Sequence, residues 1–147
     1  MAELHPFFVH FPIALVMVAS AFDAYAAVRN QVDLHKTAFI LQIMAALAAL
    51  PSAFSGNLAE IAVRSNEALA AAIAESLDRH TDMGNILVWL VIIFAVARVF
   101  AVLERKEWAL SGWVFPSLAL LLAVFTLGTG LAGGELSRNI LEYFVGN

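Results

Sequence analysis

The sequence contains no cysteine, which excludes disulfides, thiolate metal ligands and cysteine-anchored clusters or c-type haem. Charged residues are also scarce: they make up 14% of the 147 residues, against about 25% in typical soluble domains. The net charge is only −4, and no basic stripe of the kind that nucleic acid requires is present. Thiol chemistry and nucleic-acid binding are therefore excluded.

Hydrophobic residues, by contrast, reach 62% of the chain, and the mean hydropathy is +0.85. Four apolar stretches have the length of about 20 residues that a helix needs to cross a bilayer, and they cover roughly 7–28, 37–58, 86–103 and 108–131. Each must be helical, because a lone strand would leave its backbone unpaired in lipid. The first stretch has no basic residue ahead of it, so no cleavable signal peptide is expected. The sequence predicts one all-α domain over residues 1–147, a four-transmembrane-helix bundle in the lipid bilayer.

Two less apolar segments flank these spans. Residues 60–82 follow the second span, and apolar side chains recur there every four residues at Leu69, Ile73 and Leu77. This pattern predicts an amphipathic helix in the membrane interface, begun near Asn66. Residues 133–147 are predicted to form a shorter interfacial helix.

The orientation follows from the basic residues. The first and third loops, with the adjoining span ends, hold five (Arg29, Lys36, Arg98, Arg105 and Lys106), and the other side holds three (Arg64, Arg79 and Arg138). The positive-inside rule then places both termini on the outer side. Whatever the orientation, four crossings put the N-terminus, residues 60–82 and the C-terminal tail on one face.

Three of the four histidines belong to that face. His5 and His10 begin the first span, His80 precedes the third, and Glu60 closes the second. Imidazole and carboxylate together suit zinc, iron, copper or manganese, and two imidazoles alone suit the iron of haem b. We expect His10 and His80 to be the first ligands, with His5 and Glu60 next. A histidine in the membrane interface is also a common polar anchor that binds nothing.

Helix geometry limits these combinations. Residues five apart point about 140° apart on a regular helix, so His5 and His10 reach one ion only if Pro6 and Pro12 disturb the first turns. Asp82 and Glu135 are predicted to orient an imidazole by accepting its other ring N–H.

The opposite end of the bundle offers a second pair. Asp23 and Arg98 each lie about five residues before the end of a span, at similar depth. Charges inside spans usually face the bundle and pair, which predicts a salt bridge or a shared hydrogen-bond network. The alternative is that both side chains extend to the interface. His35, beside Asp33 and Lys36, is predicted to be a loop residue.

The opening motif, His5-Pro6 followed by Val9-His10-Phe11-Pro12, resembles the signature of bacterial membrane proteins called domain of unknown function 2231. Later features resemble it too: Ser55-Gly56-Asn57-Leu58-Ala59-Glu60, His80 with Asp82 and Gly84, and Gly133-Gly134. Thr81 stands where relatives often carry glutamate. The resemblance implies a four-span protein of the bacterial inner membrane, and some relatives are joined to cytochrome c or Rieske-like modules, which implies a redox setting.

The leading hypothesis is a metal- or haem-binding membrane module on the outer face, serving electron transfer or metal handling, with a redox protein or respiratory complex as its partner. The alternative is a non-catalytic subunit or assembly partner of such a complex, and copies of the chain could also associate. A proton path through Asp23 and Arg98 ranks lowest, because the middle of the spans holds no ionisable residue. The sequence has no nucleophile–base set and no phosphate-binding loop, so hydrolytic enzymes are not indicated.

Overall fold

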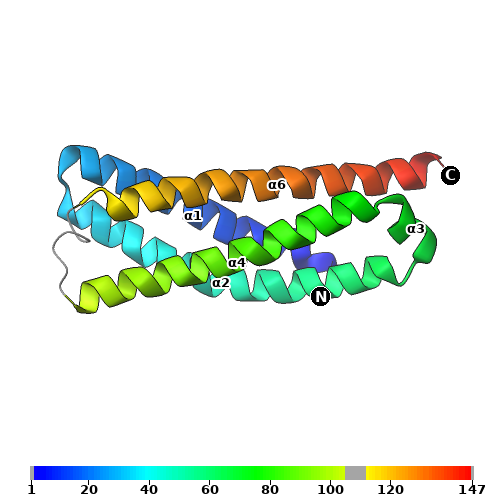
Figure 1. Cartoon of the computed structure of the whole chain (residues 1–147), viewed down its shortest axis with the longest axis horizontal. Coiled ribbons are helices and arrows are strands. Elements are labelled where there is room, and N and C mark those ends of the chain that lie inside the picture. Colours follow the sequence, from blue (N-terminus) through cyan, green and yellow to red (C-terminus); the bar gives the residue numbers. More distant parts are fainter. Residues whose placement is uncertain (1, 105–111, 147) are drawn as a thin grey trace.

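The computed structural model describes residues 2–104 and 112–146. It confirms the all-α bundle: the described residues contain helices and no strand (Figure 1). Four helices are long and apolar enough to cross a membrane. They are α1 (His5–Arg29), α2 (Val32–Arg64), α4 (Ala74–Leu103) and α6 (Val114–Gly146), accompanied by the short η1 (Ala2–Leu4) and α3 (Glu67–Ala72).

The four long helices form a square. α1 packs against α2 and α6, and α4 packs against the same two helices, so α1 faces α4 across one diagonal and α2 faces α6 across the other. Both α1 and α4 run away from the end of the bundle that carries α3, whereas α2 and α6 run towards it (Figure 1). We call this end the α3 end.

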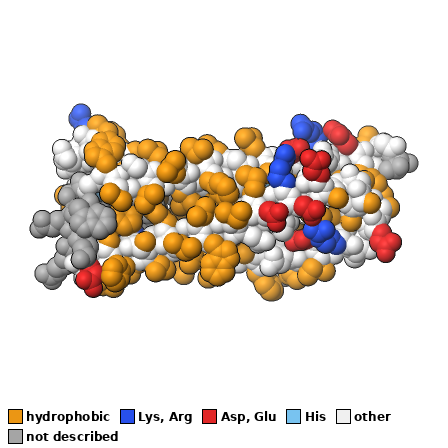
Figure 2. All heavy atoms as spheres, viewed as in Figure 1, with side chains coloured by type: hydrophobic (Ala, Val, Ile, Leu, Met, Phe, Trp, Pro, Cys, Tyr) orange, Lys and Arg blue, Asp and Glu red, His pale blue; other side chains and the backbone are white. Residues whose placement is uncertain are grey.

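Small residues fill the centre of the bundle. Ala19, Ala45 and Ala119 are fully buried, and side chains of this size let helix backbones approach closely where lipid gives no hydrophobic drive to associate. Large apolar residues instead point outwards, as Leu47 and Val124 do, each more than 60% exposed. Figure 2 shows hydrophobic side chains over the middle of the visible face, with charged ones gathered towards the α3 end. The chain is thus a multi-pass membrane protein.

Residues 60–82 do not form the single interfacial helix that their periodicity predicts. Residues 60–64 complete α2, α3 follows, capped by the Asn66 side chain at the Leu69 N–H, and residues from Ala74 onward belong to α4. The apolar positions are satisfied within the protein, because Leu69, Ile73 and Leu77 pack on Val63, Leu136, Ile140 and Tyr143. The amphipathic pattern indicates that one helix face is buried. Here a neighbouring helix, and not the membrane interface, covers that face.

The C-terminal tail also differs from its prediction as a separate helix. α6 continues without a break through Gly133 and Gly134 to Gly146, since the tail's apolar face packs on α3 and the start of α4. The predicted start of the fourth span at Trp108 lies outside the described residues, and α6 begins at Val114. The ends of α2, α4 and α6 therefore extend beyond the first turn of α1 (Figure 1).

The prolines near the α3 end have defined consequences. Pro6 lies in the first turn of α1, where its missing N–H costs nothing. Pro12 lies inside α1 and leaves the carbonyl of Phe8 without its helical donor. The Ser52 hydroxyl of α2 lies 2.9 Å from that carbonyl and 3.0 Å from the carbonyl of Ala48. The proline thus creates a polar contact that fixes α1 against α2.

Candidate functional site

The α3 end brings two imidazoles together across the bundle. His5 lies on the first turn of α1, and His80 lies on α4, the diagonally opposite helix. Their ring centres are 6.4 Å apart, and the ring planes meet at 69°. Both side chains are partly buried. The face that was predicted to collect histidines therefore contains a pair formed by His5 and His80.

The His5 imidazole rests against α2. A methyl group added to Gly56 would lie 3.0 Å from its Cε1 and 3.4 Å from its Nδ1. Its Nδ1 is 3.1 Å from the Ser55 hydroxyl, and the backbone of Ser52 lies beside the ring. We call Ser52, Ser55 and Gly56 the α2 notch.

The His80 imidazole rests against α6 in a similar way. A methyl group added to Gly133 would lie 2.9 Å from its Cε1 and 3.2 Å from its Nδ1. The backbone of Thr129 lies beside this ring, yet the buried Nδ1 has no partner at hydrogen-bonding geometry among the described residues. Ala132 occupies the position corresponding to Ser55 and offers no hydroxyl. We call Thr129, Ala132 and Gly133 the α6 notch.

The contacts of His5 favour one tautomer. When the Ser55 hydroxyl donates its single hydrogen to the Ser52 carbonyl, 3.0 Å away, it can only accept from the imidazole. This arrangement favours the form in which Nδ1 of His5 carries the hydrogen and Nε2 keeps its lone pair. An imidazole that donates from one nitrogen to an oxygen and keeps the other free is the usual form of a metal-ligating histidine.

A cavity of about 590 Å³ adjoins both imidazoles. This volume lies within the range of about 300–1,000 Å³ typical of small-molecule and cofactor sites. Its walls come from all four long helices and are mainly apolar, with Val9, Ile13, Val88 and Val91 among them. The α3 end thus contains a partly open cavity whose surface is mainly apolar.

His10 does not join the pair. It lines the same cavity, but its side chain is exposed, and its Nδ1 donates to the carbonyl of Pro6, one helical turn earlier. This local contact leaves its Nε2 free, as in His5. The structure therefore places His5 at the centre of the site and His10 at its edge.

Two of the three predicted carboxylates of this end, Glu60 and Glu135, are engaged with arginines. Glu60 lines the cavity and accepts a hydrogen bond of 2.8 Å from Arg64. Glu135 pairs with Arg79, while Asp82 is exposed. Within residues 2–104 and 112–146, no three His, Asp or Glu side chains lie close enough to hold a metal ion.

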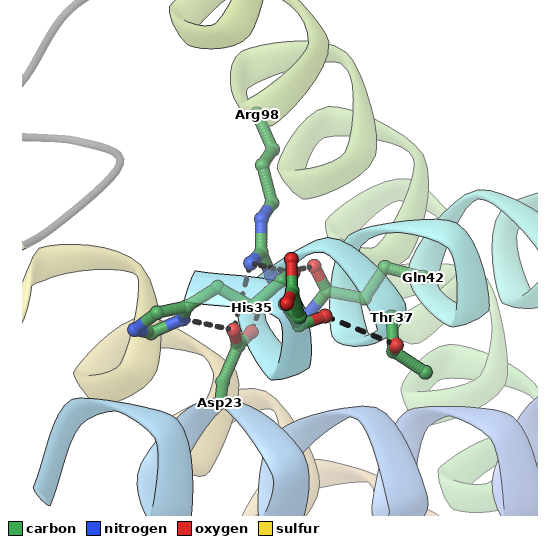
Figure 3. Close-up of polar contacts among 6 residues, drawn as sticks. Asp23, His35, Thr37, Gln42 and Arg98 are labelled. Atoms are coloured by element: carbon green, nitrogen blue, oxygen red, sulfur yellow. Dashed lines mark hydrogen bonds and ion pairs between the residues drawn. The ribbon is translucent and has the colours of Figure 1, made fainter. Parts of the chain in front are cut away.

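A second polar cluster lies at the opposite end (Figure 3). Arg98 donates from Nη2 to Oδ1 of Asp23 at 2.7 Å, and from Nη1 to the other carboxylate oxygen. Asp23 is fully buried and Arg98 is 5% exposed. Arg98 also donates to Gln42 Oε1 at 2.7 Å and to the His35 carbonyl at 3.1 Å. Three helices thus share one buried ion pair.

His35 belongs to this cluster, and its prediction as a loop residue is wrong. It lies in the first turn of α2, and its Nδ1 is 2.9 Å from Asp23 Oδ1. The start of α2 at Val32 brings it beside α1, because the connection from Arg29 is only two residues long. A short connection between two spans was the available signal, since it forces the adjoining helix ends together.

The notches were also not identified as a site, although the sequence contains a signal for them. Gly56 lies 51 residues after His5, and Gly133 lies 53 residues after His80. In each case a hydroxyl residue, Ser52 or Thr129, precedes the glycine by four positions. Comparing the two halves of the chain would have indicated both notches.

Comparison with known proteins assigns the chain to a family. Neither the curated proteins nor the solved structures contain a match. The family described as "Predicted membrane protein (DUF2231)" matches residues 2–141, which include both histidines, both notches and the buried ion pair. The chain belongs to this family of membrane proteins.

Proposed function

We propose that this protein is an electron-transfer module that binds a redox-active metal cofactor between His5 and His80, and that the cofactor is haem b. The observation that carries the proposal is the imidazole pair itself, with its ring centres 6.4 Å apart beside a cavity of about 590 Å³. This separation leaves room for one metal ion between the two imidazoles.

The ligand set supports haem over a bare ion. A protein-bound zinc or iron ion usually takes three or four protein ligands, and among the described residues only two imidazoles converge here. Glu60, the predicted carboxylate ligand, is paired with Arg64. In haem the porphyrin supplies four of the six iron ligands, so two histidines complete the set. The apolar cavity wall suits a macrocycle.

The residues of the site would have separate tasks. His5 and His80 would hold the iron, and the α2 notch would hold His5 with Nε2 free. The apolar wall would exclude water and thereby tune the reduction potential. Bound haem would supply reversible one-electron chemistry, taking an electron from a reduced redox protein and passing it to an oxidised one.

The charge bias of the loops supports an outer position for the site. The excess of Lys and Arg in the first and third loops supports a topology with both termini outside the bacterial inner membrane. The cofactor would then lie near the outer face, within reach of a soluble redox protein or of a respiratory complex in the same membrane.

The test is an optical spectrum of protein expressed with a haem supply and purified without chelator, in oxidised and reduced forms. We expect the bands of six-coordinate low-spin haem at one haem per chain. His5→Ala and His80→Ala should each abolish the low-spin form, and His10→Ala, the matched control, should retain it. Stoichiometric metal without porphyrin bands would replace haem by an ion. Neither haem nor metal would refute the proposal and favour the non-catalytic subunit.

A further inference from the structure

The two halves of the chain place a histidine and a buried ionisable residue at the same spacing. His5 precedes Asp23 by 18 residues, and His80 precedes Arg98 by 18 residues, which is five helical turns in each case. In both α1 and α4, the first residue of this pair is the histidine of the site. The second is the buried ionisable residue of the helix. α1 and α4 therefore repeat one arrangement.

The second helix of each half repeats as well. Shifting by 75 residues aligns α1 with α4, and shifting by 77 aligns α2 with α6. All the buried positions of α1 and α2 then fall on buried positions of α4 and α6. Burial alone is weak evidence for a repeat, because it recurs every three to four residues in any packed helix. The stronger evidence is that matching residue types align: His5 with His80, Val16 with Val91, Ser52 with Thr129 and Gly56 with Gly133.

Side-chain geometry supports the same correspondence independently of the alignment. Each imidazole turns its Cε1 edge to the glycine of the following long helix, at 3.0 Å from a Cβ on Gly56 and 2.9 Å from one on Gly133. In both cases Nδ1 is the next nearest ring atom and Nε2 the third. Two unrelated contacts would not be expected to agree in order and in distance.

We propose that the chain is a tandem repeat of one helical hairpin, α1–α2 and α4–α6, whose halves hold His5 and His80 in equivalent notches about a shared two-fold axis. Because α1 and α4 run in the same direction, the axis lies along the bundle, as in parallel-repeat membrane proteins. The notches are positioning elements: in both, the glycine makes room for the ring, and in the α2 notch the Ser55 hydroxyl also holds Nδ1. The role of the notches in holding a cofactor rests on the proposed function. The tandem repeat does not depend on it.

The one difference between the notches gives the sharpest test. Ser55 holds Nδ1 of His5, whereas its equivalent Ala132 leaves Nδ1 of His80 without a hydroxyl. If the notches are equivalent, Ala132→Ser supplies the missing hydrogen bond, because its hydroxyl would donate to the Thr129 carbonyl and accept from His80. Ser55→Ala should convert the His5 notch into the His80 form.

The experiment measures imidazole nitrogen chemical shifts in ¹⁵N-labelled protein, in detergent micelles and without cofactor, so that it is independent of haem binding. We expect His5 in the Nδ1–H tautomer. Ala132→Ser should move the His80 Nδ1 shift towards that of His5, and Ser55→Ala should move His5 the opposite way. An unchanged His80 signal in folded Ala132→Ser would overturn the equivalence. If that variant does not fold, an unchanged His5 signal in Ser55→Ala overturns it.

A glycine series completes the test on the holoprotein. Gly56→Ala and Gly133→Ala should each displace one imidazole and convert low-spin haem to high-spin, while Gly128→Ala should not, because Gly128 does not line the cavity and a methyl group there meets only the end of the Met83 side chain, at 3.4 Å. Equal spectra for all three variants would refute the positioning role. If no haem binds, the proposed function fails, and the chemical shifts alone decide the repeat.

Discussion

Removing Arg98 should destabilise the bundle more than removing any exposed charge. Asp23 is fully buried and has three polar contacts, two from Arg98 and one from His35. Arg98→Leu leaves the carboxylate with the imidazole alone, and breaking a buried pair from one side costs about 3–5 kcal/mol. His35→Ala removes one contact and should cost about 1.5–3 kcal/mol, the range for a hydrogen bond to a charged group.

The double variant isolates the interaction energy between the two residues from the effect of each substitution alone. Asp23→Leu with Arg98→Leu removes both charges, and replacing a buried pair by apolar residues is often close to neutral. Since each single substitution breaks the buried pair from one side at about 3–5 kcal/mol, we expect a coupling energy above about 3 kcal/mol, beyond the usual range for residues in direct contact.

The assay is the free energy of unfolding in mixed micelles, from a sodium dodecyl sulfate titration followed by circular dichroism. Lys36→Ala is the control, because its ion pair with Asp33 is exposed on both sides and such pairs contribute about 0–1 kcal/mol. The reasoning is refuted if Arg98→Leu costs no more than Lys36→Ala. It is also refuted if the coupling energy falls below about 0.5 kcal/mol, within the error of additivity.

Two further predictions concern the α3 end. Ser52→Ala should cost about 1–3 kcal/mol, because it leaves the Phe8 carbonyl, already deprived of a donor by Pro12, unsatisfied at the helix contact; the same unfolding titration measures it, and a loss below 0.5 kcal/mol would contradict it. Leu77→Ala should cost about 2–5 kcal/mol as a large-to-small change in a packed cluster, whereas Ile61→Ala, 66% exposed, should cost much less. An equal loss of unfolding free energy for the two variants would mean that Leu77 does not lie in a packed cluster at the α3 end.

The spans could be predicted because bilayer thickness fixes helix length, and residue counting then fixes depth. Asp23 and Arg98 each lie a little over one turn before a span end, and the constant rise per residue is enough to set them level. The separate interfacial helices could not be predicted correctly, because periodicity shows that Leu69 and Leu77 share a buried face but does not show whether lipid or Leu136 covers it.

The choice between His5 and His10 was also beyond the sequence. The two residues point about 140° apart on α1, so only one can face α4, and the rotation of α1 decides which. That rotation is set by contacts made elsewhere along the helix, such as Ser52 with the Phe8 carbonyl and Ser20 with the Ala119 carbonyl at 2.8 Å. Five residues of local sequence do not contain this information.

The proposed tandem repeat explains how one bundle can hold both a pair of identical histidines and a pair of oppositely charged residues. The proposed ligand pair uses the same residue on both sides of the axis, His5 and His80. A buried charge pair needs different residues at one repeat position, as Asp23 and Arg98 are. Two separate copies of one hairpin would place like charges opposite each other in lipid, where neither is compensated. Linking the two hairpins in one chain lets the histidines stay equal while the charged position becomes complementary. The ion pair then favours association of one hairpin with the other over association with its own copy.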